Sequence, residues 1–403
     1  METGERLSSP TADPMDDTPH VASGDRRRPG AAPMWWLLLA FAVVVGAVAG
    51  AAGGVGAVLL LGERDGAATP PADATPLAAT PVPQSTVAPD PLSTAIARVM
   101  PAVVTVVAQL PDRLDDEGRT VGRNHIGSGI VVTEAGHVLT TFHTVEQAER
   151  IFVVLITGER REAALVGTDS PYTDMAVLKI TSGGLRRAPL GSVRGARSGD
   201  PVAAISGGLI DAANKVTTGV ISATGIRWPR VGVVLEDLVQ TDASVNHGDS
   251  GGALVTASGS VVGLLTTVVR LDPSGFTVEG VAFAQSMDSL APQLEAIIEE
   301  GAYPRPRPGI EQPGRHHLEV TEVLAEELDL PVVSGALLTA VEPGSPAEGA
   351  GLLPGDIVVG VNGRAVNSGA PLVNLLKTLS LSGPAELLIV RAEREIVVAV
   401  PLA

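Results

Sequence analysis

The feature that most restricts the fold is a series of short apolar runs between residues 93 and 285. Gly, Asp and Ser interrupt these runs, which include AVVTVVAQL, GSGIVVTEAGHVLTT, RIFVVLITG, PVAAIS and KVTTGVISATG. Strand-length apolar segments that recur at this spacing are typical of β-barrels and β-sandwiches. Aromatic residues make up only 2% of the chain, so Ala, Val, Leu and Gly must fill the interior, which suits small barrels. We therefore predict an all-β domain over residues 93–300.

An amphipathic helix is predicted at the end of this domain. Its apolar residues recur at i, i+4, i+7 and i+8, and Gly301 is a stop signal. The apolar positions are Leu290, Leu294, Ile297 and Ile298. Prolines and arginines follow, so we place a linker at 301–308. Residues 309–403 are predicted to form a small α+β domain, a size that can fold alone.

The chain before residue 93 has a different composition. Residues 1–33 are polar and without periodicity, which predicts a disordered tail. Residues 34–61 carry no charged side chain, and about 20 apolar residues suffice to cross a bilayer, so we predict a transmembrane helix there. Residues 62–92 are rich in Pro, Ala and Thr and are predicted to be a linker.

The charges next to the apolar segment predict its orientation. Arg26–Arg28 precede it, and the positive-inside rule puts them in the cytoplasm. We therefore expect a single-pass protein of the cell membrane whose folded domains lie outside the cytoplasm. A cleaved signal peptide is the alternative, because Ala47-Val48-Ala49 resembles a cleavage site. The apolar run continues well past that point, which favours the anchor.

Several function classes are excluded by composition. The formal net charge of −17 argues against nucleic acid as a partner. Cysteine is absent, no lysine follows a glycine, and no His-Glu-x-x-His occurs, which excludes thiol catalysis, a Gly-Lys phosphate loop and a zincin site. His316 and His317 lack an acidic partner at ligand spacing, so we expect them to face solvent. No metal or other cofactor is expected.

The strongest catalytic signal is the segment Asn246-His-Gly-Asp-Ser-Gly-Gly252. A serine hydroxyl needs a base to become a nucleophile, and glycines around it permit a tight turn whose N–H groups converge on one point. We assign Ser250 as the nucleophile and the N–H groups of Gly248 and Ser250 as an oxyanion hole. An ordinary turn is the alternative, since Gly-Asp-Ser-Gly also occurs outside active sites.

Two upstream segments supply a base and its partner. His143 ends the segment Val-Leu-Thr-Thr-Phe-His, and Asp174 precedes Met-Ala-Val-Leu-Lys-Ile. The order His, Asp, Ser with Gly-Asp-Ser-Gly-Gly resembles the chymotrypsin-like double-barrel proteases. The segments GSGIVV, TDMAVLKI, VTTGVISA and QTDASVNHGDSGGAL resemble their HtrA branch. By this resemblance Ser250 attacks, His143 carries the proton and Asp174 orients the histidine.

The resemblance has further implications for specificity and departures from the family. In chymotrypsin-like folds the side chain six positions before the nucleophile lies at the base of the specificity pocket, and here it is the neutral Ser244. The family usually has Asn where this chain has Asp249. The implied function is hydrolysis of unfolded or mis-sorted extracytoplasmic proteins, and the implied assembly is a homotrimer. A catalytically weak chaperone or a peptide-sensing membrane protein with the same fold is the alternative.

The C-terminal segment 335–366 resembles the PDZ domains of the same family. A strand, a short helix, a Gly-Asp turn, a second strand and an Asn-Gly hairpin can be read along it. Such domains add a peptide as a strand and bind its terminal carboxylate with backbone N–H groups. The matching loop is Pro308-Gly309-Ile310, so Gly309 and Ile310 are the predicted peptide-binding residues. Pro308 has no N–H to donate.

Overall fold

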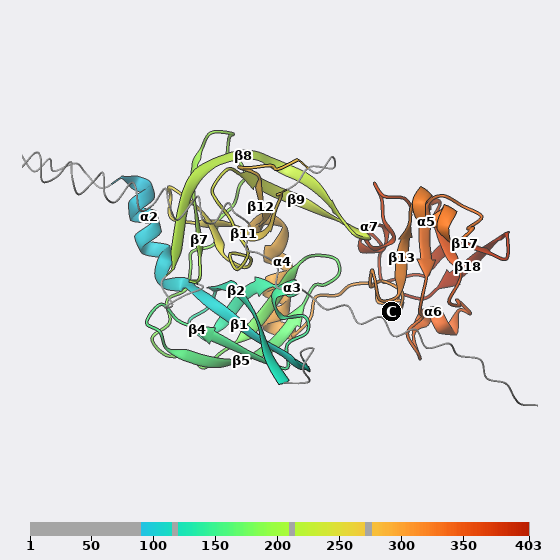
Figure 1. Cartoon of the computed structure of the whole chain (residues 1–403), viewed down its shortest axis with the longest axis horizontal. Coiled ribbons are helices and arrows are strands. Elements are labelled where there is room, and N and C mark those ends of the chain that lie inside the picture. The colour runs from blue at the N-terminus through green and yellow to red at the C-terminus, as the bar shows by residue number, and fades with distance from the viewer. Residues whose placement is uncertain (1–89, 115–119, 209–213, 271–275, 403) are drawn as a thin grey trace, which may run out of the picture. The chain divides into compact units, whose positions relative to one another are not determined.

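The structure of the chain is a computed structural model that describes residues 90–114, 120–208, 214–270 and 276–402 (Figure 1). The predicted tail and transmembrane helix lie outside the described residues, as does most of the predicted linker at 62–92. No helix in the described ranges is long and apolar enough to cross a membrane. The first described helix is α2 (Pro91–Val99), which begins with a proline and is capped by the Asp90 side chain.

The first six strands close into an antiparallel barrel in the order β1-β2-β3-β6-β5-β4. Figure 1 labels β1, β2, β4 and β5 of this barrel. The strands are β1 (Val103–Leu114), β2 (Thr120–Val131), β3 (His137–Thr141), β4 (Arg150–Val154), β5 (Arg160–Thr168) and β6 (Met175–Lys179). A single turn of helix, α3 (Phe142–Val145), directly follows β3. The end of β3 and the start of β6 are paired, so the residues at these two points lie side by side.

A second barrel has the order β10-β11-β12-β9-β8-β7. Its strands are β7 (Pro201–Ser206), β8 (Lys215–Arg230), β9 (Val233–Thr241), β10 (Ala253–Thr256), β11 (Val261–Val268) and β12 (Ala282–Ser286). β8 and β9 form a long hairpin whose register shifts at several bulges. The predicted double barrel is therefore confirmed.

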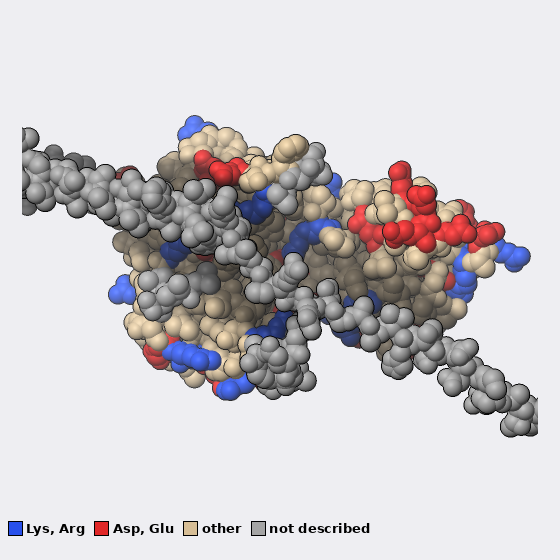
Figure 2. All heavy atoms as spheres, viewed as in Figure 1, with Lys and Arg blue, Asp and Glu red and all other residues tan. Residues whose placement is uncertain are grey.

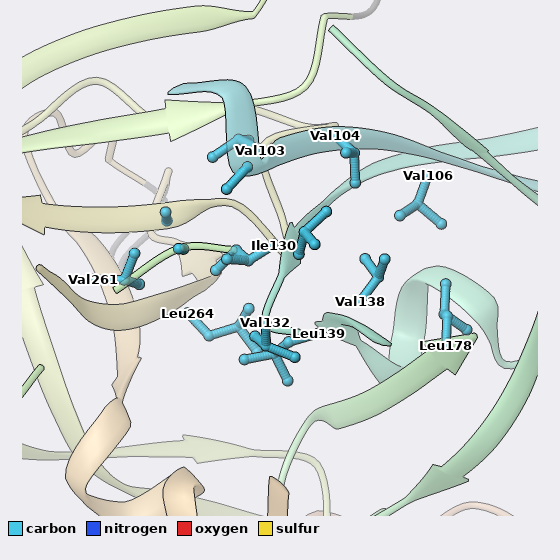
Figure 3. Packing of buried hydrophobic residues seen from close by; sticks show 14 of the residues in the cluster. Val103, Val104, Val106, Ile130, Val132, Val138, Leu139, Leu178, Val261 and Leu264 are labelled. Atoms are coloured by element: carbon cyan, nitrogen blue, oxygen red, sulfur yellow. The ribbon is translucent and has the colours of Figure 1, made fainter. Parts of the chain in front are cut away.

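A hydrophobic core joins the two barrels. Val138, Leu139 and Ile130 of the first barrel pack in the same cluster as Val261 and Leu264 of β11 (Figure 3). Each of these side chains is fully buried, and full burial of a Val, Leu or Ile contributes about 1.5–3 kcal/mol. The barrels are thus held in fixed relation, as a site built from both of them requires.

The predicted amphipathic helix is α4 (Met287–Glu300). Leu290, Leu294 and Ile297 are buried in the core that the barrels share. The helix ends at Gly301, whose φ of 80° is left-handed and whose N–H bonds the Ile297 carbonyl. A left-handed C-cap of this kind favours glycine because it has no Cβ.

The C-terminal domain is a sheet with its own core. Its strands β13 (His317–Val320), β14 (Gly335–Leu338), β15 (Ile357–Val361), β17 (Ala385–Arg391) and β18 (Arg394–Val400) pair in that order, and β16 (Arg364–Ala365) pairs with β15. The helices are α5 (Glu322–Glu327), α6 (Pro346–Gly349) and α7 (Leu372–Lys377). Figure 2 shows acidic side chains gathered on this domain, where α5 carries Glu322, Glu326 and Glu327.

The segment that joins α4 to this domain is tied to the first barrel. Arg305 donates two hydrogen bonds of 2.8 Å to the buried Asp169 carboxylate. The Tyr172 hydroxyl donates to the Pro306 carbonyl oxygen, and the Tyr172 ring packs in the core of the C-terminal domain. Burial raises the pKa of the Tyr172 phenol, so it remains a donor at neutral pH. The linker is therefore anchored to the loop that leads to Asp174.

Candidate active site

His143 and Asp174 are held together by the pairing of β3 with β6. Asp174 directly precedes β6, and its carbonyl oxygen accepts the Phe142 N–H. Its carboxylate accepts the His143 backbone N–H at 3.0 Å and the ring Nδ1 at 2.6 Å. A carboxylate only accepts, so Nδ1 must carry the proton. The other ring nitrogen, Nε2, is then free to accept a proton from a nucleophile.

Asp174 remains ionised although it is buried. Burial alone would raise the pKa of this carboxyl, but the hydrogen bond and charge of His143, together with Arg230, hold the pKa below its ordinary value. Oδ2 also accepts the Thr266 hydroxyl at 2.8 Å and Arg230 Nη1 at 3.2 Å. Asp174 is thus a fixed negative charge against His143. Neither Thr266 nor Arg230 was identified from the sequence.

Ser250 lies between β9 and β10 and lines the same cavity as His143. This cleft has a volume of about 520 Å³. The Ser250 hydroxyl is 3.5 Å from the Thr266 carbonyl oxygen, and within the described residues no hydrogen bond joins it to His143. Catalytic hydrogen bonds are often long in a free enzyme and tighten when substrate binds. Thr266 therefore contacts both the orienting acid and the nucleophile.

The loop before Ser250 offers N–H groups to a developing negative charge. Asp249 N donates to the Asn246 carbonyl at 3.1 Å, and Gly248 has a φ of 90°. A positive φ at the third residue of a turn is the type II arrangement, which favours glycine there. In the described part of the chain, the N–H groups of Gly248 and Ser250 donate no hydrogen bond. They are therefore free to donate to an oxyanion.

The Gly127-Ser128-Gly129 segment of β2 braces this loop. Ser128 N donates to the Ser250 carbonyl at 2.7 Å, and Ser128 Oγ donates to the Gly248 carbonyl at 2.8 Å. A Cβ on Gly251 would lie 2.0 Å from the Ser128 carbonyl oxygen, so this close approach requires glycine. The first barrel therefore positions the nucleophile of the second.

Asp249 is the internal anchor of the same loop. Its buried carboxylate accepts Ser206 Oγ at 2.6 Å, Asn246 N at 2.7 Å and Lys215 Nζ at 2.6 Å. Lys215, at the start of β8, is the charged partner of this carboxylate. A buried carboxylate that loses its cation is strongly destabilised. The departure from the family's usual Asn at this position is thus matched by a lysine that compensates its charge.

Lys215→Met is expected to lower kcat by about 10²-fold while changing KM by less than about threefold, because it loosens a loop whose N–H groups act in the transition state. Lys179→Met is the matched control, since the Lys179 ammonium bonds the Ala135 carbonyl on an exposed surface. Steady-state kinetics on a peptide substrate measure both constants.

The double variant Lys215→Met/Asp249→Asn is expected to recover most of the lost kcat, because it removes the uncompensated charge. A general loss of packing at Lys215 would not be rescued by a change at Asp249. Equal loss in the single and double variants would contradict the proposed pairing.

Ser244 lies beside the cleft rather than in it. It lines a cavity of about 340 Å³ that shares Val245, Val268 and Arg270 with the active-site cleft. Ser244 is exposed, and its carbonyl accepts the Thr217 hydroxyl. The cavity is also lined by the charged residues Asp242 and Glu279.

Two further histidines share the active-site cleft. The ring of His125 lies 6.3 Å from that of His143, and His247 is part of the oxyanion loop. Burial lowers the pKa of His125, and the nearby His143 and His247 lower it further. A neutral His125 adds no charge beside His143 at neutral pH.

The histidine pair of the C-terminal domain corrects a prediction. We expected His316 and His317 to face solvent, but both are buried. His317 Nδ1 donates to the Ile310 carbonyl at 2.8 Å, so the His317 ring contacts the predicted peptide-binding loop. No group of three metal-ligating side chains is present among the described residues.

Gly309 and Ile310, the predicted peptide-binding residues, lie in one loop before β13. Both are buried, and both N–H groups donate to the carboxylate of Glu311, at 2.8 and 3.1 Å. Glu311 is the neighbour of this loop in sequence and was not identified from it.

The two closed antiparallel barrels together supply a nucleophilic serine, a histidine and a buried aspartate. This combination of fold and site defines a serine endopeptidase of the trypsin-like class. A family model for the trypsin-like peptidase domain matches residues 127–264, and a PDZ domain model matches residues 337–391.

Comparison with known proteins identifies the family within the trypsin-like class to which this chain belongs. The chain is 34% identical to "Serine endoprotease DegS" of Salmonella typhimurium over 290 residues, which is 71% of this chain and 76% of that protein. It is 31% identical to "Putative serine protease HhoA" of Synechocystis over 339 residues, covering 76% and 82% of the two chains. The solved structure "HtrA-type protease AlgW with decapeptide" has a TM-score of 0.51 at 30% identity, with 77% of this chain and 97% of that chain covered. The chain belongs to the HtrA family of serine proteases.

Proposed function

We propose that this serine endopeptidase cleaves unfolded or mis-sorted proteins outside the cytoplasm, under the control of its PDZ domain. The observation that carries the proposal is a Ser-His-Asp site whose acid is linked through one hairpin to the PDZ domain. The hairpin is β8–β9, and it carries Arg230, which contacts the Asp174 carboxylate. Relatives named as endoproteases and a relative solved with a peptide support the same conclusion.

Contacts at the other side of the hairpin reach helix α7. The Asn374 amide group bonds both Val234 N and Val234 O at 2.8 Å. Val233 packs against the core of the C-terminal domain, and Gly232 N donates to Glu319. A peptide that displaces these contacts would move Arg230 relative to Asp174. The PDZ domain would thereby change the activity, by an amount set by the peptide's differential affinity for the two states.

The cleavage sites in unfolded casein are expected to follow small or medium apolar residues such as Val, Ala or Leu. Ser244 provides no carboxylate for a basic side chain, and Val245 and Val268 line both the cleft and its side cavity. Mass spectrometry identifies the cleavage products from casein and from a natively folded protein of similar size. It measures both the specificity for the residue before the cut and the preference for unfolded over folded substrate. Cleavage mainly after Arg or Lys, or equal cleavage of the folded protein, would contradict the proposed substrate class.

Membrane anchoring through residues 34–61 is part of the proposal, as is a homotrimeric assembly. Protease added outside intact spheroplasts is expected to digest the chain after residue 62, and carbonate washing is expected to leave the full-length chain in the membrane. Accessibility of residues 1–33 alone would reverse the proposed orientation. Sedimentation of the detergent-solubilised chain reports the number of subunits.

A further inference from the structure

The loop Pro308-Gly309-Ile310 is built as a carboxylate-binding nest. Its three carbonyl groups all accept from the domain: Pro308 O from Ala347 N, Gly309 O from Glu342 N, and Ile310 O from His317 Nδ1, at 2.8–3.0 Å. Because the three carbonyl groups bond to the domain, the N–H groups of Gly309 and Ile310 can donate to a different partner. Consecutive N–H groups of this kind bind anions.

The conformation of this loop is specified by two residues. Gly309 has a φ of 91°, and a Cβ there would lie 2.3 Å from the Ser345 side chain, so only glycine fits. Burial lowers the pKa of His317 to about 4, so the ring is neutral near pH 7 and its Nδ1–H is the donor to Ile310. The nest is therefore a formed feature of the fold.

The partner of the nest is the next residue in the chain. Glu311 Oε2 accepts Gly309 N at 2.8 Å and Ile310 N at 3.1 Å, and Glu311 is only 3% exposed. Pro308 has no N–H, so these two bonds use every donor that the three residues possess. Hydrogen bonds from N–H groups to a carboxylate are stronger than those to a neutral acceptor.

We propose that Glu311 is a ligand built into the chain, which occupies the place of a peptide's terminal carboxylate and restricts the PDZ domain to internal, extended segments. An internal segment adds as a strand through its backbone and needs no carboxylate site. A free C-terminus must first displace Glu311, so its carboxylate adds little affinity. This inference rests on the proposed peptide-binding role of the domain, and it specifies the ligand class as unfolded chain rather than protein ends.

The test uses the purified full-length chain and a fluorescein-labelled decapeptide ending in valine, either with a free carboxylate or amidated. Wild type is expected to bind the two forms with nearly equal Kd. Glu311→Ala is expected to bind the free form at least about tenfold more tightly and the amidated form unchanged. A tenfold gain corresponds to a nest that is free in about one wild-type molecule in ten.

Glu342→Gln is the matched control, because Glu342 is an exposed carboxylate next to Gly309 that accepts none of the nest's N–H groups. It removes the same charge near the same loop and is expected to behave as wild type. Glu311→Gln keeps the side chain's shape and is expected to bind the free-carboxylate peptide at least about threefold more tightly than wild type. This variant tests the proposal if Glu311→Ala does not fold.

Two outcomes would overturn the inference. One is a wild-type preference of tenfold or more for the free carboxylate over the amide. The other is a folded Glu311 variant with no gain for the free form. Casein turnover in the same samples reports separately on the proposed function: binding that follows these expectations without any effect of peptide on kcat would contradict PDZ control and leave the role of Glu311 standing.

Discussion

Ser250→Ala is expected to lower kcat on unfolded casein by about 10⁶-fold, because loss of the nucleophile in a triad removes the covalent step. The Ser250 hydroxyl lies in the cleft with His143, and its neighbouring N–H groups have no other partner in the described chain. Removal of the hydroxyl leaves this hole and the cleft intact, so KM should change little. Residual turnover above the uncatalysed rate is expected from the hole and from substrate binding.

Ser258→Ala is the control for this experiment. Ser258 lies in the turn between β10 and β11, where its hydroxyl contacts Thr256. The substitution removes the same group from the same barrel, and kcat should remain that of wild type. Equal casein turnover by Ser250→Ala and wild type would overturn the assignment of the nucleophile and would favour the alternative of a chaperone that uses a protease fold without hydrolysis.

The parts of the site that could be predicted from sequence are those written in contiguous segments. His143, Asp174 and Ser250 each lie in a short motif, and α4 was recognisable from apolar spacing and its terminal Gly301. Apolar periodicity and turn residues are local properties, so they can be recognised in a single sequence. The structure brings His143 and Asp174 into contact by pairing β3 with β6.

The residues that escaped prediction act through partners remote in sequence. Thr266 and Arg230 reach Asp174 from two different strands of the second barrel, and Lys215 reaches Asp249 from the start of β8. A single Thr, Arg or Lys in a strand has no local pattern that marks such a role. Only the closure of the barrel, which sets strand order and register, determines these contacts.

The C-terminal domain shows a different limit of sequence reasoning. The PDZ resemblance predicted Gly309 and Ile310 as donors to a peptide, and in the structure both N–H groups donate to the Glu311 carboxylate. Glu311 follows them directly, yet residue type alone does not reveal that its side chain folds back onto their N–H groups. The burial of His316 and His317 likewise depends on tertiary packing, which residue type alone does not indicate.

Asp174→Asn is expected to lower kcat by up to about 10⁴-fold, the loss that such triads suffer when the histidine adopts the wrong tautomer. An amide has a donor nitrogen and an acceptor oxygen where the carboxylate has two acceptor oxygens. With its nitrogen toward His143 Nδ1, it would donate to the ring and stabilise the tautomer whose Nε2 already carries a proton. With its oxygen there, the nitrogen would face the His143 backbone N–H, now 3.0 Å from a carboxylate oxygen.

Arg230 and Thr266 decide between these two orientations. Both donate to the same oxygen that bonds His143 Nδ1, so in the Asp174→Asn variant they favour the amide oxygen at that position and oppose the wrong tautomer. The negative charge that stabilises the imidazolium is lost in either case. Asp174→Asn/Arg230→Ala is therefore expected to be less active than Asp174→Asn alone, because the amide is then free to turn its nitrogen toward the ring.

Steady-state kinetics on a peptide substrate compare these variants with Asp200→Asn, whose carboxylate caps the Arg197 N–H in a loop before β7. That control should keep the kcat of wild type. A kcat for Asp174→Asn within tenfold of wild type would show that His143 is oriented without the carboxylate. Asp174 is the only hydrogen-bond partner of His143 Nδ1 among the described residues, and it also accepts the His143 backbone N–H, so both the ring and the backbone of His143 depend on this carboxylate.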